Sequence, residues 1–353
     1  MKRLIASSEK VVAVGDQFIS TGHFQRAIKD IPIDFVGIDL PGSKEKQHSE
    51  QQIMEFKGSN AVPPDAVVLE GIKDATIIMG HFAPMGAAFI NSAPHLKLIA
   101  VARTGLENVD IDAATSRGIG VVPAIGRNAN AVAELQIGLM IAETRNISRA
   151  DASIKSGGWR NDFPGARIEI GGSTVGMIGF GQVGRSFAKK LAGFEPRMLI
   201  FDPHVKDEDI KAYGAERATT IDQVFKESDF IAIQARLSPE TERFINKHHF
   251  DLMKPTAYFI NVSRSRLVNT ADLVATLKGG KISGAGIDVF DSEPLAADDP
   301  LRTLDNATLT THFGGDTEGT KSHSTELCAS AIQNYLDTGK VGWAVNAREL
   351  GWV

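Results

Sequence analysis

The stretch Gly172-Ser-Thr-Val-Gly-Met-Ile-Gly-Phe-Gly-Gln-Val-Gly184 decides the fold of this chain. Its apolar residues predict a short buried strand, and a helix-like stretch follows the last glycine. Between them, Gly179 permits a tight turn, Gly181 lets the backbone approach a pyrophosphate, and Gly184 lets the helix pack closely on the strand. The start of that helix offers free backbone amides to phosphates. The spacing therefore predicts a dinucleotide-binding turn, with contacts from Gly179, Gly181, Gln182, Val183 and Gly184.

A carboxylate follows the next predicted strand. Residues 197–201 read as this strand, and Asp202 comes directly after it, 18 residues beyond Gly184. An acidic residue near this spacing accepts hydrogen bonds from ribose hydroxyls in dinucleotide-binding units. It would repel the 2′-phosphate of NADP, and the next residues, Pro203 and His204, supply no arginine to neutralise that phosphate. We therefore expect NAD as the cofactor, with Asp202 on its ribose.

The composition limits the other classes of function. With 353 residues, 42% hydrophobic and 23% charged, the chain is typical of a globular protein of about two domains. Its net charge of −5 gives no electrostatic argument for binding nucleic acid or an anionic membrane. No apolar run approaches the ~20 residues of a membrane span, and the run at residues 1–6 is too short for a signal peptide. The single cysteine, Cys328, excludes an internal disulfide and indicates a reducing cytoplasm.

Strand and helix patterns alternate along the chain, which predicts an α/β fold with parallel sheets. The predicted strands are 11–14, 35–38, 76–79, 98–101, 120–122, 230–235, 257–262, 284–289 and 307–309. A polar surface excursion is expected over 41–64, one long helix over 130–155 and a last helix over 317–337. The apolar stripe of the long helix fits either the core or a dimer surface.

Three chemically complementary residues follow three of these strands. Arg264, Glu293 and His312 are far apart in sequence, but the carboxyl ends of parallel strands line one crevice. An arginine can hold a carboxylate with two hydrogen bonds. A histidine can move a proton to or from a carbonyl oxygen, and a glutamate can orient the imidazole. The set fits hydride transfer between a dinucleotide and a 2-oxo acid.

The motifs around these residues resemble the D-isomer-specific 2-hydroxyacid dehydrogenase family. Beyond the glycine turn, the matching stretches are Asn261-Val-Ser-Arg264, Gly286-Ile-Asp288-Val-Phe-x-x-Glu293-Pro294, His312-Phe-Gly-Gly315, Gly118-Ile-Gly-Val-Val122 and Asn130-Ala-Val-Ala-Glu134. The resemblance covers nearly the whole chain and is clearest from residue 96 to residue 315. It implies two doubly wound parallel-sheet domains of the Rossmann-like or flavodoxin-like type, with a cleft between them.

The resemblance also implies roles and boundaries. Arg264, Glu293 and His312 would be catalytic, Asp288 would orient the nicotinamide, and Gly314 would contact the cofactor. The NAD-binding Rossmann domain would span residues 125–316 and would be inserted into a substrate domain of residues 1–124 and 317–353. Family members usually pair through their cofactor domains, which implies a homodimer.

Several residues near the expected substrate site depart from the family pattern, and they do not by themselves identify the substrate. Arg103-Thr-Gly105 aligns with the loop whose backbone amides bind the substrate carboxylate, and Arg103 replaces a usual glycine. Arg236 replaces a usual proline near the crevice, and Ser265 replaces a usual glycine after the catalytic arginine. Two extra arginines would suit a second anionic group such as a phosphate, or would simply pair with surface carboxylates. His81 enters the same region, so we expect substrate contacts from His81, Arg103, Thr104 and Gly105.

The sequence thus predicts an NAD-dependent D-2-hydroxyacid dehydrogenase acting on a small 2-oxo or 2-hydroxy acid, phosphorylated or sugar-derived. The alternative is an NAD(H)-sensing binding protein like the co-repressor branch of the same fold, which also retains the Arg, Glu and His. No metal is expected, because His248 and His249 have no accompanying ligands at metal spacing. The identity of the hydroxy acid and the physiological direction do not follow from the residues.

Overall fold

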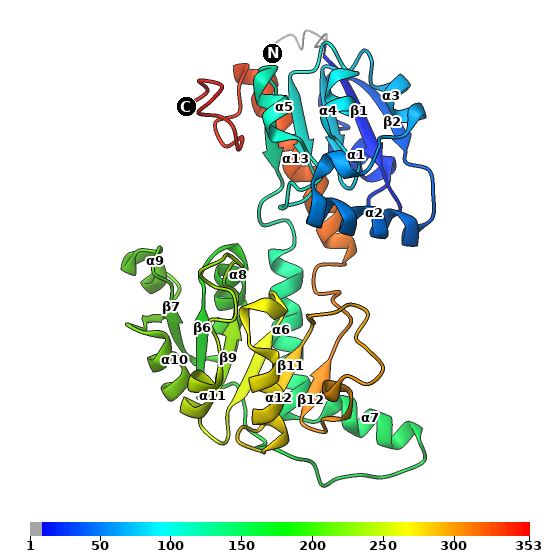
Figure 1. Ribbon diagram of the computed structural model, residues 1–353. Coiled ribbons are helices and arrows are strands. Elements are labelled where there is room, and N and C mark those ends of the chain that lie inside the picture. The colour runs from blue at the N-terminus through cyan, green and yellow to red at the C-terminus, as the bar shows by residue number, and fades with distance from the viewer. Residues whose placement is uncertain (1–8) are drawn as a thin grey trace. The chain divides into compact units, whose positions relative to one another are not determined.

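The computed structural model describes residues 9–353, so the N-terminal run at residues 1–6 lies outside the described residues. The chain divides into two compact units, each described by itself. The first unit combines residues 1–127 with 317–353, and the second spans residues 128–316. Figure 1 shows each unit as strands covered by helices. Among the described residues, no helix is long and apolar enough to cross a membrane.

The first unit is a parallel sheet of strand order β2-β1-β3-β4-β5 within the described residues. Its strands are β1 (Lys10–Gly15), β2 (Asp34–Asp39), β3 (Ile77–Gly80), β4 (Leu98–Val101) and β5 (Gly120–Pro123). Its helices are α1 (Thr21–Ala27), α2 (Lys44–Lys57), η1 (Ser59–Ala61), α3 (Ala66–Gly71), α4 (Ala87–Asn91), α5 (Ile111–Ser116) and α13 (Glu318–Thr338). The strand order reverses between β1 and β3, as in flavodoxin-like sheets.

The second unit is a longer parallel sheet of order β12-β11-β10-β9-β6-β7-β8, counted over residues 128–316. Its strands are β6 (Thr174–Ile178), β7 (Arg197–Phe201), β8 (Glu216–Arg217), β9 (Phe230–Ile233), β10 (Tyr258–Asn261), β11 (Gly284–Ile287) and β12 (Ala307–Leu309). Its helices are α6 (Ala129–Thr144), α7 (Ile147–Lys155), α8 (Gln182–Leu191), η2 (Ala192–Phe194), α9 (Asp207–Lys211), α10 (Ile221–Glu227), α11 (Lys247–Leu252), η3 (Ser265–Leu267), α12 (Thr270–Lys278) and η4 (Pro300–Thr303). The order reverses between β6 and β9, which is the Rossmann arrangement.

The α/β prediction of two doubly wound parallel sheets is confirmed. One predicted element is wrong. The single helix expected over 130–155 is two helices, α6 and α7, which are separated at Asn146. Asn146 takes a left-handed conformation with φ of 55°, which stops the helix. The apolar stripe divides at this break, because α6 buries Val132, Leu139 and Met140 whereas none of the described residues of α7 is buried.

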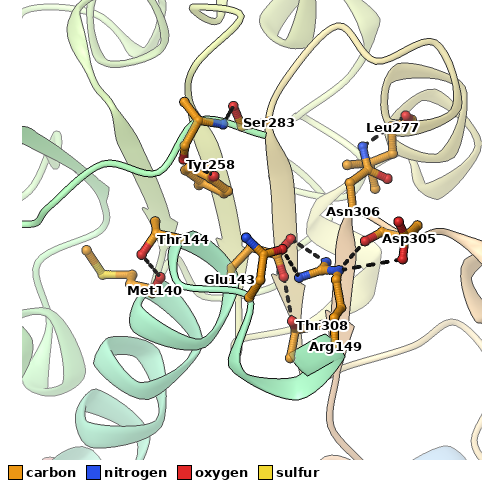
Figure 2. Close-up of polar contacts among 12 residues, drawn as sticks. Met140, Glu143, Thr144, Arg149, Tyr258, Leu277, Ser283, Asp305, Asn306 and Thr308 are labelled. Carbon is orange, nitrogen blue, oxygen red and sulfur yellow. Dashed lines mark hydrogen bonds and ion pairs between the residues drawn. The ribbon is translucent and has the colours of Figure 1, made fainter. Parts of the chain in front are cut away.

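A buried ionic network joins the end of α6 to the edge strand β12 (Figure 2). Glu143 is 2% exposed and accepts hydrogen bonds from Arg149 Nη2 at 2.7 Å and from Thr308 Oγ1 at 2.5 Å. Burial raises the pKa of Glu143, and Arg149 and Thr308 partly offset this effect. Arg149 also donates to the carbonyl of Asp305. The network fixes the amino end of β12, and His312 follows the other end of this strand.

Candidate functional site

The glycine turn of the second unit has the geometry that a dinucleotide requires. Gly179 adopts φ of 97°, and a Cβ there would lie 2.8 Å from the backbone nitrogen of Ala235. A Cβ on Gly184 would lie 2.8 Å from the carbonyl oxygen of Gly179, so the helix packs closely at this point. Gly181 is the N-cap of α8, without a side-chain cap, and a Cβ there would meet no described atom within 4 Å. Uncapped amides beside open space suit a pyrophosphate, so these residues fit the expected cofactor.

Asp202 follows β7 and is held by backbone amides. Its Oδ2 accepts from Phe180 N at 2.7 Å, and its Oδ1 accepts from His204 N at 2.8 Å and Val205 N at 3.2 Å. The carboxylate is therefore oriented beside the glycine turn, where the ribose of a bound dinucleotide is expected. Two oxygens provide about four acceptor positions, so these three bonds leave about one position for a ribose hydroxyl.

A positive residue that sequence reasoning missed lies close to Asp202. Arg217 of β8 donates from Nη1 to the carbonyl oxygen of Asp202 at 2.7 Å, and it also bonds the carbonyl of Val205 and the carboxylate of Asp207. The sequence supplied no signal for this contact, because β8 has two residues and shows no periodicity. The guanidinium is occupied by these partners, so it stabilises the loop that carries Asp202.

The candidate catalytic residues follow three adjacent strands of the second sheet. Arg264 comes after β10, Glu293 after β11 and His312 after β12, and these strands pair in parallel as β10-β11-β12. Arg236 follows β9, the next strand of the same sheet, and is exposed. The carboxyl ends of these strands lie at the same edge as the glycine turn after β6, because the whole sheet is parallel.

His312 and Glu293 form a hydrogen-bonded pair. His312 Nδ1 lies 2.9 Å from Glu293 Oε1 and 2.8 Å from Oε2, and the two side chains are 43% and 33% exposed. His312 has φ of 55°, a left-handed conformation that is uncommon outside glycine. A carboxylate at Nδ1 places a proton there and leaves Nε2 to exchange protons with a ligand.

Asp288 supports the loop that carries His312. It is 1% exposed, and it accepts from Thr310 Oγ1 at 2.5 Å, Phe313 N at 3.2 Å and Gly314 N at 3.0 Å. These bonds occupy the carboxylate of Asp288 and the backbone amide of Gly314. Both residues are expected to contact the cofactor. The structure therefore places Asp288 behind the loop as its main anchor, and the contribution of Thr310 to this anchor was not foreseen from the sequence.

Arg264 is exposed at the turn that follows β10. Its Nη1 donates to the carbonyl oxygen of Ser263 at 2.8 Å, and Asn261 Nδ2 donates to the carbonyl oxygen of Arg264 at 3.1 Å. The second bond explains the asparagine of the Asn261-to-Arg264 motif, since it orders the turn after β10. The guanidinium is thus held at the edge of the sheet in a form that can receive a carboxylate.

The first unit holds the residues expected to contact substrate. His81 follows β3 and Arg103 follows β4, and the strands are neighbours. Thr104 Oγ1 donates to the carbonyl oxygen of Ala124 at 3.3 Å, and a Cβ on Gly105 would collide with the carboxylate of Glu107. In residues 9–353, no group of three or more His, Cys, Asp or Glu side chains is arranged to hold a metal.

Comparisons with known proteins agree with this geometry. Residues 137–314 match the sequence profile described as D-isomer specific 2-hydroxyacid dehydrogenase, NAD binding domain. The chain is 38% identical over 271 residues to a D-3-phosphoglycerate dehydrogenase of Methanocaldococcus jannaschii, covering 76% of this chain but only 51% of that relative. It therefore spans about half the length of that enzyme. It is 33% identical over 308 residues to a glyoxylate reductase of Thermococcus litoralis, covering 85% of this chain and 92% of the relative.

Solved structures show the same fold. D-2-hydroxyisocaproate dehydrogenase superposes with a TM-score of 0.77 at 22% identity, covering 94% of this chain and 98% of that structure. The TT0316 protein of Thermus thermophilus superposes with a TM-score of 0.68 at 25% identity, covering 93% of this chain and 97% of that structure.

Proposed function

The chain belongs to the D-isomer-specific 2-hydroxyacid dehydrogenase family, and from this premise we propose that it transfers a hydride between NAD(H) and a 2-hydroxy acid of D configuration. The observation that carries the proposal is the pair of His312 Nδ1 and Glu293, 2.8 Å apart, at the sheet edge that also holds the glycine turn. A histidine oriented in this way supplies the proton that hydride addition to a carbonyl requires.

Each residue then has a defined task. NAD(H), when bound, supplies or receives the hydride. His312 donates a proton from Nε2 to the carbonyl oxygen during reduction, and accepts one from the hydroxyl group during oxidation. Glu293 is a positioning residue that holds Nδ1 of His312 through the hydrogen bond between them. Arg264 binds the substrate carboxylate through two hydrogen bonds.

The cofactor contacts are assigned to the second unit. Gly179, Gly181 and Gly184 shape the turn, and Gln182 and Val183 offer the first amides of α8 to the pyrophosphate. Asp202 accepts from the adenosine ribose and repels a 2′-phosphate, which favours NAD over NADP. Asp288 and Gly314 act through the loop of His312, which they hold at the nicotinamide end.

Further substrate contacts are assigned to residues of the first unit. Backbone amides of Thr104 and Gly105 bind the substrate carboxylate, and Arg103 and His81 contact the remainder of the molecule. Because the chain spans about half of the phosphoglycerate dehydrogenase that it matches, the name of that relative does not identify the substrate. The substrate class has to come from the site itself.

Enzyme assays distinguish a dehydrogenase from an NAD(H)-sensing binding protein. We expect NADH oxidation with at least one of glyoxylate, pyruvate and hydroxypyruvate. We expect His312→Ala to lower kcat by about two to four decades, the scale of a lost general acid, with the Kd of NADH little changed. His95→Ala, at an exposed site of the first unit, is the control. NADH binding without turnover of any 2-oxo acid would favour the sensing protein.

We also propose a homodimer in the cytoplasm. Helix α7 and the loop after it expose Ile147 at 51%, Ile154 at 57% and Trp159 at 83%, and Figure 1 shows α7 standing apart from the sheet of its unit. A second copy would cover this apolar surface. Light scattering should therefore give the mass of a dimer, and Ile154→Asp should shift it toward that of a monomer. The cytoplasmic location rests on the single cysteine, Cys328, which is buried.

A further inference from the structure

The loop after β7 folds around the guanidinium of Arg217. Arg217 Nη1 donates to the carbonyl oxygen of Asp202 at 2.7 Å, and Nη2 donates to the carbonyl oxygen of Val205. The backbone amides of His204 and Val205 donate in turn to Asp202 Oδ1, at 2.8 Å and 3.2 Å. One short loop therefore holds a carboxylate and a guanidinium together at the strand end where the adenosine ribose of a dinucleotide is expected.

An arginine in this region of a dinucleotide-binding unit favours NADP, because its charge accommodates the 2′-phosphate. Arg217 comes from β8, the strand next to β7, and its side chain is 25% exposed. A guanidinium has five N–H donors, and the bonds to Asp202, Val205 and Asp207 use three of them. Arg217 would therefore offset the repulsion with which Asp202 disfavours NADP, if its charge were not compensated.

Asp207 compensates this charge. Arg217 Nε donates to Asp207 Oδ1, whereas its other two partners are neutral carbonyl oxygens. Within residues 9–353, Asp207 is the only carboxylate in an ion pair with Arg217. Asp207 is the first residue of α9, and its side chain is 56% exposed. An aspartate–arginine pair has no net charge, so it attracts a further anion much less than a lone guanidinium does.

The same helix turn neutralises a second arginine. Arg185 of α8 lies over the ring of Phe180, with its guanidinium carbon 5.2 Å from the ring centre, and Phe180 N donates to Asp202 Oδ2. Arg185 Nη2 lies 3.4 Å from Asp209 Oδ2. Asp207 and Asp209 both belong to the first turn of α9. This turn therefore supplies a carboxylate to each of the two arginines around Asp202.

We propose that Asp207 is a specificity-determining residue for the cofactor, because it neutralises Arg217 beside Asp202 and so denies the 2′-phosphate of NADP a counter-charge. A phosphate monoester carries up to about two negative charges at neutral pH, and at this loop it would meet the carboxylate of Asp202 and an arginine that is already paired. Selection of NAD then depends on the ion pair of Arg217 with Asp207, and not on the lack of an arginine near Asp202. This assignment deepens the proposed use of NAD and rests on it.

Cofactor binding without substrate tests this role. The Kd values of NADH and NADPH are measured by fluorescence titration for wild type and for Asp207→Asn. Asparagine retains an oxygen that can accept from Arg217 Nε, so the variant removes the neutralising charge and keeps the acceptor. We expect the Kd of NADPH to fall about fivefold, the scale of one exposed ion pair, while the Kd of NADH stays nearly unchanged. The gain should shrink between about 0.1 M and about 1 M salt, because the screening length falls from about 10 Å to about 3 Å.

Two controls separate the released charge from other effects. Adding Arg217→Met to Asp207→Asn should abolish the gain in NADPH affinity, because the guanidinium is gone. Glu208→Gln removes a charge from the same turn, at an exposed residue with no ion pair in the described part of the chain, and should leave both Kd values unchanged. Thermal unfolding checks that every variant is folded.

The outcomes that contradict this role are distinct from those that contradict the activity. An unchanged or raised Kd of NADPH in Asp207→Asn, a gain that survives Arg217→Met, or an equal gain in Glu208→Gln would overturn the role of Asp207. Wild type that binds NADPH as tightly as NADH would overturn it together with the role of Asp202. Absence of NADH oxidation with every 2-oxo acid would overturn the proposed dehydrogenase and leave these binding results standing, because they need no substrate.

Discussion

Replacing Arg149 by methionine should destabilise the second unit strongly and in a pH-dependent way. The variant keeps the apolar stem of the side chain but removes the bond of 2.7 Å from Nη2 to Glu143. Glu143 remains buried and retains its bond of 2.5 Å from Thr308 Oγ1. Removal of one partner from a buried ion pair costs about 3–5 kcal/mol, because the other charge is left uncompensated. Since Thr308 still donates to Glu143, we expect a loss near the lower limit, about 3 kcal/mol at pH 7.

The pH dependence follows from the direction of the pKa shift. The folded state raises the pKa of Glu143 above its ordinary value, so this group contributes stability that is fully present below about pH 4.3 and is lost as the pH rises through the raised pKa. Arg149 is the main influence that opposes the rise, so its removal raises the pKa of Glu143 further. The loss caused by Arg149→Met should therefore be larger at pH 7 than at pH 5, where more of the carboxyl is protonated.

Amide hydrogen exchange read by mass spectrometry suits this test, because peptides from α6 and β12 report on the second unit alone. Adding Glu143→Gln to Arg149→Met should restore most of the lost free energy, since a neutral amide needs no cation. Arg160→Met is a matched control, because Arg160 pairs with the exposed Asp305 and should change the exchange much less. A loss that is equal at both pH values and is not rescued by Glu143→Gln would mean that Arg149 acts by packing, and the electrostatic reasoning would be wrong.

Four further substitutions test the site. Asp202→Ala should narrow the preference for NADH over NADPH, which we expect to be at least about tenfold in wild type, or about 1.4 kcal/mol. If the ratio of the kcat/KM values for the two cofactors is unchanged in this variant, Asp202 does not contact the ribose. Glu293→Gln should lower kcat by more than it changes KM, because the amide orients His312 less well; equal kcat in steady-state assays would count against the pair. Gly181→Ala should fold normally, since its Cβ meets open space, but it should raise the Kd of NADH in a fluorescence titration. Gly179→Ala should instead lower the melting temperature, because its Cβ would lie 2.8 Å from Ala235 N. A destabilised Gly181→Ala variant together with a normally stable Gly179→Ala variant that binds NADH weakly would refute these two roles.

The features that were predictable from the sequence depend on short stretches of chain. The glycine turn needs backbone freedom at Gly179 and close approach at Gly184, and both requirements are met by residues within one strand-turn-helix unit. The strand positions followed from apolar runs, and the parallel order followed from their alternation with helices. The chemistry of Arg264, Glu293 and His312 could be anticipated because parallel strands bring their carboxyl ends to one edge.

Other features arise only when distant segments fold together. The contact of Arg217 with the carbonyl of Asp202 requires β8 to pair with β7, and two residues carry no periodicity that would reveal a strand. The apolar pattern does not reveal the break at Asn146, because apolar residues continue on both sides of it. A residue in the left-handed conformation changes the direction of the backbone without changing the hydrophobicity of the sequence.

Two buried hydrogen-bonded pairs show most clearly that some contacts depend on distant segments of the chain. Asp16 and His81 are 65 residues apart and meet only because β1 and β3 are neighbours, and Glu143 meets Thr308 across 165 residues. The sequence by itself determined the α/β fold, the dinucleotide turn and the identity of the catalytic candidates, because each can be read from short stretches of chain. Only the tertiary structure decided which polar atoms are paired and which are left free, because the partner of a buried group is set by the packing of strands that are distant in the chain.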